Sequence, residues 1–366
     1  MENLTINKNG STFLNLLRVI AAQAVVVGHL ISWLNIFPKL QPPFLPYMQG
    51  LGVVVFFILS GMVIPYSTAQ KLNANPNYSF KEFFIERFAR IYSAYFPCLL
   101  FVVIIDFIMI RIDSSSYGYY ENFNLSAFFS NLFMLQDHPL KHHFGIFSAE
   151  SFGSNRPLWT LSVEWWIYFW FGFLYIVLIK NKKVNPLTIL VFVVFSIVPY
   201  YNLGRGRGEG LMLAWLLGCV VILLLPTLNK LKLNKYLILF FVICLAGMAV
   251  RRYLNGASFG YSESLYTIYI AVAISLLISY FNTVNFSEKI HKIINVLADF
   301  SFSVYLLHYS IISLLLLLFK DKINPYLFLI VAFFVSNIVA YYFAYFTEMK
   351  YKTLRSFLKR KLLPTN

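Results

Sequence analysis

Long apolar stretches separated by short polar segments follow one another along almost the whole chain. A run of about twenty apolar residues is long enough to cross a bilayer as an α-helix. The pattern predicts about ten such helices, at residues 12–34, 48–68, 83–110, 158–179, 186–203, 209–226, 236–254, 264–282, 300–319 and 324–346. We therefore expect an all-α integral membrane protein, a polytopic bundle of about ten transmembrane helices.

Two polar segments stand apart from this pattern. Residues 111–157 form the longest one, and within them Asn124 to Leu135 groups aromatic and aliphatic residues with few charges. Such a segment is typical of a helix lying in the membrane interface or covering the bundle as a lid. We predict a membrane domain over 1–349, with 111–157 as an extracytoplasmic loop or lid, and a basic cytoplasmic tail over 350–366.

Composition supports this assignment and explains the charge. Of the 366 residues, 59% are hydrophobic and 12% are charged, against about 25% charged in soluble proteins. With the N-terminus in the cytoplasm, the inside segments hold roughly twice as many Lys and Arg residues as the outside segments, which predicts that both termini are cytoplasmic. The net charge of +15 then faces anionic membrane lipid, so we predict no nucleic-acid partner.

Two cationic groups interrupt the first apolar stretch, Arg18 and His29. Ionisable groups in hydrocarbon cost several kcal/mol unless they face a polar interior. They are roughly 16 Å apart along a helix axis, so each lies toward a different membrane face. His29, near the outer end, is a candidate general base. The alternative is a histidine that hydrogen-bonds a neighbouring helix.

Glu164 lies in the segment LWTLSVEWWIYF. It is roughly 9 Å below the outer surface at the usual helical rise, a depth similar to that of His29. A carboxylate beside a histidine orients the ring and stabilises the imidazolium, as in hydroxyl activation. The alternative is a structural ion pair with Arg156.

Other polar positions give weaker signals. Arg87 and Arg90 lie one helical turn apart at a cytoplasmic helix end, which suits phosphate or pyrophosphate but equally suits ordinary cytoplasmic anchoring. Ser60 and Gly61 lie in the middle of the second span, where small residues indicate close helix packing.

Two groups of histidines remain. Tyr305 and His308 share a helix face, so they line a polar interior or form an interhelical hydrogen bond. His138, His142 and His143 lie on the outer loop without a carboxylate or cysteine at ligand spacing, so we predict a solvated loop and no metal.

Five segments together resemble the membrane acyltransferase-3 family, the O-acyltransferases of bacterial polysaccharides. They occur in the order that the family shows. Each motif alone is a weak signal, whereas the five together are a specific one. They are Arg18-x-x-Ala21-x-x-x-Val25-x-x-x-His29, Gly52-Val53 to Ser60-Gly61, Phe84 through Arg87, Arg90 and Ile91-Tyr92, Leu158 to Glu164, and Ser303 to His308.

The resemblance implies a donor, usually acetyl-CoA, on the cytoplasmic side of the bacterial inner membrane, and an acceptor sugar hydroxyl, usually outside. It implies that Arg18 and His29 are the essential pair and that Arg87 and Arg90 contact the donor. We place Ser60, Tyr305 and His308 with the donor-binding residues. Some members carry an esterase-like domain after the last span, and we expect none here. The family's usual proline after Arg-Ile-Tyr is replaced by Ser93-Ala94, with Pro97 nearby.

We therefore expect an O-acetyltransferase that moves an acetyl group from acetyl-CoA to a hydroxyl of a cell-surface polysaccharide or lipid-linked sugar, as in an O-antigen of lipopolysaccharide. Arg87 and Arg90 would hold donor phosphates, and Arg18 would polarise or steer the thioester. His29, oriented by Glu164, would remove the acceptor proton. The expected partners are membrane lipid, the carbohydrate acceptor and glycan-assembly proteins.

Two alternatives from other classes fit the same polar positions. A transporter or flippase for a polysaccharide or lipid-linked sugar also carries intramembrane charges, although the internal repeats that are common in transporters are not found in this sequence. A structural partner of a glycan-synthesis complex would keep its role when those charges are removed.

Overall fold

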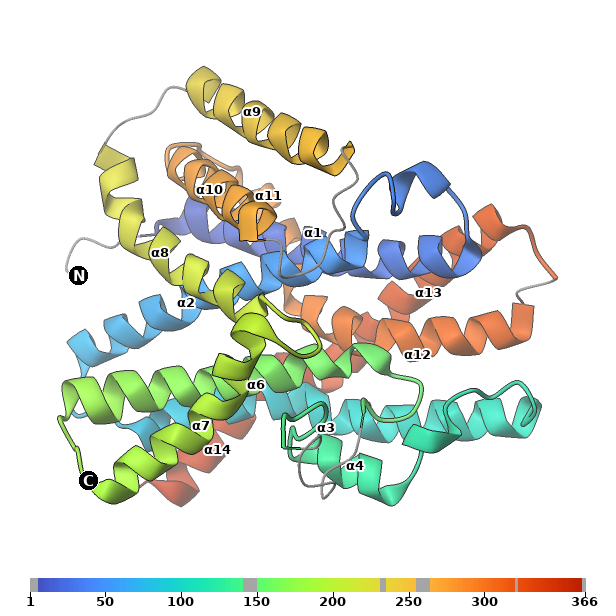
Figure 1. The fold of residues 1–366 in the computed structure, drawn as a ribbon, viewed down its shortest axis with the longest axis horizontal. Helices are drawn as coiled ribbons and strands as arrows, with labels where there is room; N and C mark the ends of the chain where they lie inside the picture. Colours follow the sequence, from blue (N-terminus) through green and yellow to red (C-terminus); the bar gives the residue numbers. More distant parts are fainter. Residues whose placement is uncertain (1–5, 141–149, 231–234, 255–263, 320–321, 364–366) are drawn as a thin grey trace. The chain divides into compact units, whose positions relative to one another are not determined.

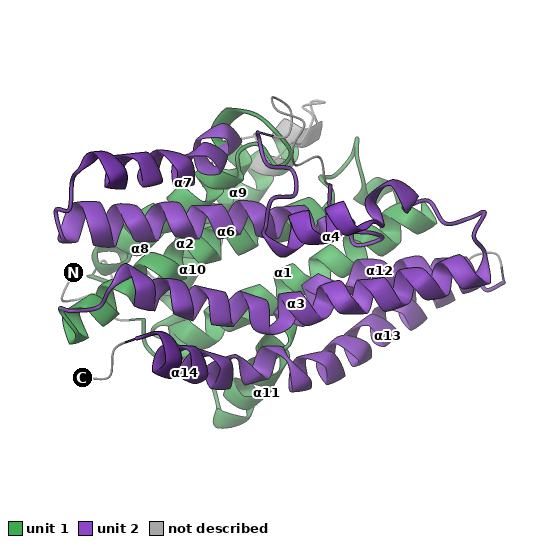
Figure 2. Cartoon of the chain, turned by 90° about the horizontal axis from the view of Figure 1, so that it is seen from below, with its two compact units in different colours: residues 1–76, 203–301 green, residues 77–202, 302–366 purple. Residues whose placement is uncertain are grey.

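The computed structural model describes residues 6–140, 150–230, 235–254, 264–319 and 322–363, and within these ranges the regular structure is helical without strands (Figure 1). The chain divides into two compact units, each assembled from two separate stretches of sequence. Unit 1 comprises residues 1–76 and 203–301, and unit 2 comprises residues 77–202 and 302–366 (Figure 2).

The prediction of an all-α polytopic membrane protein is confirmed. Within the described residues, eight helices are long and apolar enough to cross a membrane, and two shorter apolar helices cover 235–248 and 265–281. These two correspond to the predicted seventh and eighth spans. The chain is thus a multi-pass membrane protein.

Unit 1 is built around the second helix of the chain. Its helices are α1 (Lys8–Leu34), α2 (Met48–Ala74), α8 (Leu211–Lys230), α9 (Lys235–Leu254), α10 (Ser264–Phe281) and α11 (Glu288–Asp299). Helix α2 packs against both α1 and α8, α10 contacts α1, α8 and α9, and α11 packs against α1.

Helix α1 is capped at both ends, which sets the register of its polar residues. The Asn7 side chain accepts a hydrogen bond from the Gly10 N–H at 2.9 Å, and Asn35 ends the helix with a left-handed φ of 50°. Capping of this kind satisfies backbone groups that have no partner inside the helix. Both Arg18 and His29 therefore lie within one continuous helix.

Glycines bring the backbones of α2 and α8 into direct contact. A Cβ atom placed on Gly61 would lie 1.9 Å from the carbonyl oxygen of Trp215, and one placed on Gly218 would lie 2.1 Å from that of Ile58. No larger residue fits at either position without moving a backbone. The prediction that Ser60-Gly61 marks close helix packing is confirmed.

Unit 2 is built around the third helix of the chain. Its helices are α3 (Phe80–Ile112), α4 (Leu125–Leu132), α6 (Trp159–Gly172), which continues as a π-helix over Phe173–Lys180, α7 (Pro186–Gly204), α12 (Ser301–Phe319), α13 (Pro325–Phe346) and α14 (Tyr351–Leu362). Helix α3 packs against α6 and α14. The helix predicted over 124–135 forms as α4, capped by Asn124.

The basic C-terminal segment forms a helix that is docked on α3. Lys359 of α14 forms an ion pair with the buried carboxylate of Glu86 at 2.8 Å, and Lys81 donates a hydrogen bond to the carbonyl oxygen of Leu362. A carboxylate this deeply buried needs a charged partner. The basic residues of this segment therefore hold α14 in place as well as adding positive charge.

Candidate functional site

The two polar residues of α1 lie on one face of the helix. Arg18 and His29 are separated by eleven residues, which is close to three full turns, and both are partly buried. The His29 ring lies 6.3 Å from that of Trp33, one turn later, between ring centroids. A Cβ atom on Gly28 would lie 2.5 Å from the backbone nitrogen of Gln49, so the start of α2 is tightly packed beside His29.

Ser60 is partly buried on α2, next to the glycine contact with α8. Helices α1 and α2 are antiparallel here, because Gln49 lies beside Gly28 while Gly52 lies beside Ala21, with its Cβ position 2.6 Å from the Ala21 carbonyl oxygen. Continuing this register places Ser60 nearer to the level of Arg18 than to that of His29.

Glu164 lies in the middle of α6 and is partly buried. The hydroxyl of Tyr168, one helical turn later, donates a hydrogen bond to Glu164 Oε1. Arg156, the structural partner considered for this carboxylate, forms an ion pair with Glu150 at 3.2 Å. His29 and Glu164 belong to different units, so their pairing stays a prediction.

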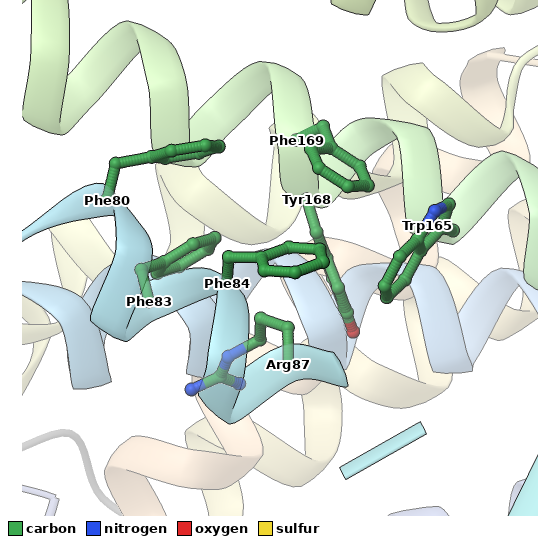
Figure 3. Close-up of a pocket in the computed structure, with 7 residues that line it drawn as sticks. All are labelled: Phe80, Phe83, Phe84, Arg87, Trp165, Tyr168 and Phe169. Atoms are coloured by element: carbon green, nitrogen blue, oxygen red, sulfur yellow. The ribbon is translucent and has the colours of Figure 1, made fainter. Parts of the chain in front are cut away.

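A small cavity with mainly aromatic walls lies between α3 and α6 (Figure 3). Its volume is about 10 Å³, enough for about one water molecule. Tyr168, the hydrogen-bond donor to Glu164, contributes to its wall together with Arg87. The full lining consists of Phe80, Phe83, Phe84 and Arg87 from α3 and Trp165, Tyr168 and Phe169 from α6.

Arg87 is partly buried against these rings. Its guanidinium carbon lies 5.6 Å from the centroid of the Phe83 ring, a cation–π distance. Its Nε is buried, and no acceptor among the described residues forms a hydrogen bond with it. A buried donor without an acceptor costs about 1–3 kcal/mol, so this atom is suited to a water molecule or an anionic ligand.

Arg90, one turn later on α3, is in a different environment. It forms an ion pair with the fully buried Glu348 at 3.0 Å, and its guanidinium lies 4.9 Å from the centroid of the Tyr351 ring. The other oxygen of Glu348 accepts hydrogen bonds from the N–H and hydroxyl of Ser303 at 2.9 and 2.8 Å. Arg90 is therefore held in a network that joins α3 to the start of α12.

Tyr305 links two of the sequence segments. It is buried on α12, and its hydroxyl donates to the carbonyl oxygen of Pro157 at 2.9 Å and hydrogen-bonds the hydroxyl of Thr160. His308 is fully buried, and its Nδ1 lies 2.9 Å from the carbonyl oxygen of Tyr305 in its own helix. Tyr305 thus connects α12 to the start of α6, whereas the Nδ1 of His308 bonds within its own helix.

The prediction of a solvated loop is wrong for His138, the described member of the loop histidines, which is buried and accepts a hydrogen bond from the Leu140 N–H at 3.3 Å. Burial lowers the pKa of this imidazole. His142 and His143 lie outside the described residues. Within the described part of the chain, no three His, Cys, Asp or Glu side chains are grouped as metal ligands are.

Asp106 is a buried carboxylate that the sequence pattern did not single out. This carboxylate is completely buried in α3 and accepts hydrogen bonds from the Ser154 N–H at 2.7 Å and the Tyr117 hydroxyl at 2.8 Å. Gly153, with a φ of +54°, lets the loop approach, since a Cβ there would lie 2.0 Å from Asp106 Oδ2. An acidic residue inside an apolar stretch was the available signal. Asp106 anchors the loop that leads into α6.

The fold and these positions define a polytopic helical membrane protein with polar groups buried at several depths of its helices. A family model described as an acyltransferase domain matches residues 11–345, which is nearly the whole chain. The chain belongs to the acyltransferase-3 family and is a membrane acyltransferase. Comparison with curated proteins and with solved structures gave no match.

Proposed function

We propose that this acyltransferase is an O-acetyltransferase of the bacterial inner membrane, with both termini cytoplasmic. It moves an acetyl group from cytoplasmic acetyl-CoA to a hydroxyl of a cell-surface polysaccharide or lipid-linked sugar. The observation that carries the proposal is the position of Arg18 and His29 on one face of α1 in a chain of the acyltransferase-3 family.

In this proposal His29 acts as a general base. Neutral imidazole takes the proton of the acceptor hydroxyl, and the oxygen attacks the thioester carbonyl. Arg18, roughly 16 Å from His29 along the helix axis, steers the thioester of the donor toward the histidine. The tetrahedral intermediate collapses with cleavage of the C–S bond, and the coenzyme A thiolate takes the proton from the His29 imidazolium, which restores the neutral base. The proposal assigns to Glu164, which accepts a hydrogen bond from Tyr168, the orientation of the His29 ring.

The two arginines of α3 have separate roles toward the donor. The buried Nε of Arg87 is available to a phosphate oxygen, which gives a charge-assisted hydrogen bond. Arg90 adds positive charge nearby while Glu348 fixes its position. Ser60 lies toward the level of Arg18, on the proposed path of the donor thioester toward His29. Tyr305 and His308 are proposed to line the donor path: Tyr305 fixes the start of α6 through Pro157, and His308 hydrogen-bonds the Tyr305 carbonyl oxygen within α12.

The test measures acetate on the cell-surface polysaccharide by proton NMR in a deletion strain that expresses each variant. We expect His29→Ala to abolish acetylation and Glu164→Gln to reduce it at least tenfold. Ile20→Ala, at an exposed position of the same helix, is the matched control and should retain it. Full acetylation by His29→Ala at normal protein level removes His29 from the reaction.

A second measurement separates acetyl transfer from transport. Purified protein is given acetyl-CoA labelled in the acetyl group, together with polysaccharide and lipid-linked sugars extracted from the deletion strain. We expect labelled acceptor and free coenzyme A in equal amounts. A transporter or flippase would give neither product, and that result would remove the proposed activity.

A further inference from the structure

Unit 1 contains a cavity much larger than the aromatic cavity of unit 2. Its volume is about 320 Å³, within the range of ligand-binding pockets. The walls come from the segment between α1 and α2, the first turn of α2 at Leu51, and the facing sides of α9 and α10. We call it the α9–α10 slot.

The slot is elongated along the helices. On α9 the lining extends from Val242 to Val250, and on α10 it extends from Tyr266 to Ala273. These intervals correspond to about 12 Å and about 10 Å of helical rise. A space of this length parallel to membrane helices has the shape of an extended chain rather than of a compact sugar ring.

The chemistry of the walls points to hydrocarbon. The lining side chains are aliphatic apart from two tyrosines, and none carries a charge. A nucleotide or sugar bound here would lose its hydrogen bonds to water without gaining replacements, which costs several kcal/mol. A hydrocarbon chain meets no such penalty and can pack closely against the aliphatic side chains of the walls.

The slot lies close to the level of His29. Leu51 lines it, and Gln49, two residues earlier on α2, is packed against Gly28, the neighbour of His29. Two residues correspond to about 3 Å of helical rise. Leu239, Phe240 and Ile243 on α9 are each more than half exposed. A chain can therefore approach α9 from the bilayer.

We propose that the α9–α10 slot binds the hydrocarbon chain of a lipid-linked acceptor and so holds its sugar at the level of His29. This inference rests on the proposed function and narrows its acceptor to a membrane-anchored glycolipid. The proximity to His29 favours the acceptor over a bulk phospholipid, which has no need to lie near the reacting groups.

Photo-crosslinking of the purified full-length protein tests this assignment without requiring turnover. The probes are farnesyl phosphate carrying a diazirine and a phosphatidylethanolamine carrying the same group, with peptide mapping of the labelled sites. We expect the farnesyl probe to label residues 242–250 and 266–273, and excess unlabelled farnesyl phosphate to suppress the labelling. Preferential labelling by the phospholipid, or no labelling of these helices, overturns the proposal.

Variants of α10 provide the matched pair. Ala273→Phe fills the slot and should reduce farnesyl labelling at least fivefold. Val272→Phe adds the same ring at an exposed neighbouring position and should leave it unchanged. Equal labelling of both variants overturns the proposal.

The outcome is separable from that of the proposed chemistry. His29→Ala should be labelled like the unmodified protein, because the probe undergoes no transfer. Normal polysaccharide acetylation without labelling of the slot contradicts only the lipid site. Normal labelling with full acetylation by His29→Ala contradicts only the role of the base.

Discussion

Units 1 and 2 are held together by different means. In unit 1, α2 and α8 meet backbone to backbone at Gly61 and Gly218. In unit 2, buried carboxylates at Asp106 and Glu348 join segments that are far apart in sequence. In a bilayer, lipid is as apolar as the side chains, so helices associate through close contact of small residues or through polar groups. The contact between α2 and α8 uses the first solution, and the contacts of Asp106 and Glu348 use the second.

Removing Arg90 should have the largest effect. Arg90→Met leaves the carboxylate of Glu348 buried without its cation, and we expect a loss of about 3 kcal/mol in unfolding free energy. Thermal unfolding in detergent measures it. The double variant Arg90→Met with Glu348→Gln should cost clearly less than the two single variants added together. Strict additivity would show that the pair does not hold unit 2 together.

Adding one methyl group to unit 1 should cost somewhat less. Gly61→Ala forces α2 and α8 apart, with an expected loss of about 2 kcal/mol. Gly247→Ala is the matched control, because a Cβ on this exposed α9 glycine meets nothing within 4 Å. Equal thermal midpoints for the two variants would contradict the backbone contact.

Arg87 should separate binding from stability. Arg87→Met removes the buried Nε but no ion pair of the described network. We expect the KM for acetyl-CoA to rise about tenfold, because one charge-assisted hydrogen bond to the donor is lost. The thermal midpoint should be unchanged. Arg90→Met should instead lower the thermal midpoint. If Arg87→Met lowers the thermal midpoint as much as Arg90→Met, Arg87 is also structural.

The smallest effect should come from an exposed pair in unit 1. Lys8 and Glu288 form an ion pair at 2.6 Å, and Lys8 lowers the pKa of Glu288 from its ordinary value of 4.5. The carboxylate therefore adds stability above pH 4.5, which is lost as the pH falls through the lowered folded-state pKa. We expect the thermal midpoint of Glu288→Gln to fall slightly less on acidification than that of the unmodified protein, and added salt to reduce the difference between the two proteins. A larger fall for Glu288→Gln would contradict the stabilising role of the carboxylate.

Apolar patterning predicts where helices lie along the chain, whereas the residues at which they begin and end depend on local polar groups. The third span was predicted from Phe83, but α3 begins at Phe80 because Ser79 and Glu82 form a capping box. The continuation of α6 as a π-helix and the docking of residues 351–362 on α3 both depend on tertiary contacts. Apolar periodicity carries no information about either feature.

The sequence indicates which residues belong to the candidate site better than it indicates what each of them does there. Arg87 and Arg90 are equivalent in the sequence, and the contact with Glu348, 258 residues away, distinguishes them. The sequence places Tyr305 with the donor-binding residues, but its hydrogen bond to the Pro157 carbonyl oxygen can be identified only from the structure. Asp106 has partners at Ser154 and Tyr117 that apolar patterning could not identify. Arg18, His29 and Glu164 could be selected because an ionisable side chain in hydrocarbon carries a high free-energy cost. That cost can be recognised in the sequence without knowing which residue contacts the side chain.

The chain passes from one unit to the other three times, near residues 76, 202 and 301. During synthesis the ribosome therefore starts unit 1, leaves it with α1 and α2 alone, and completes most of unit 2 before α8 is made. The glycine face of α2 must wait in the membrane for a partner translated about 150 residues later. A nascent chain stalled before residue 211 would expose that face to membrane chaperones and proteases.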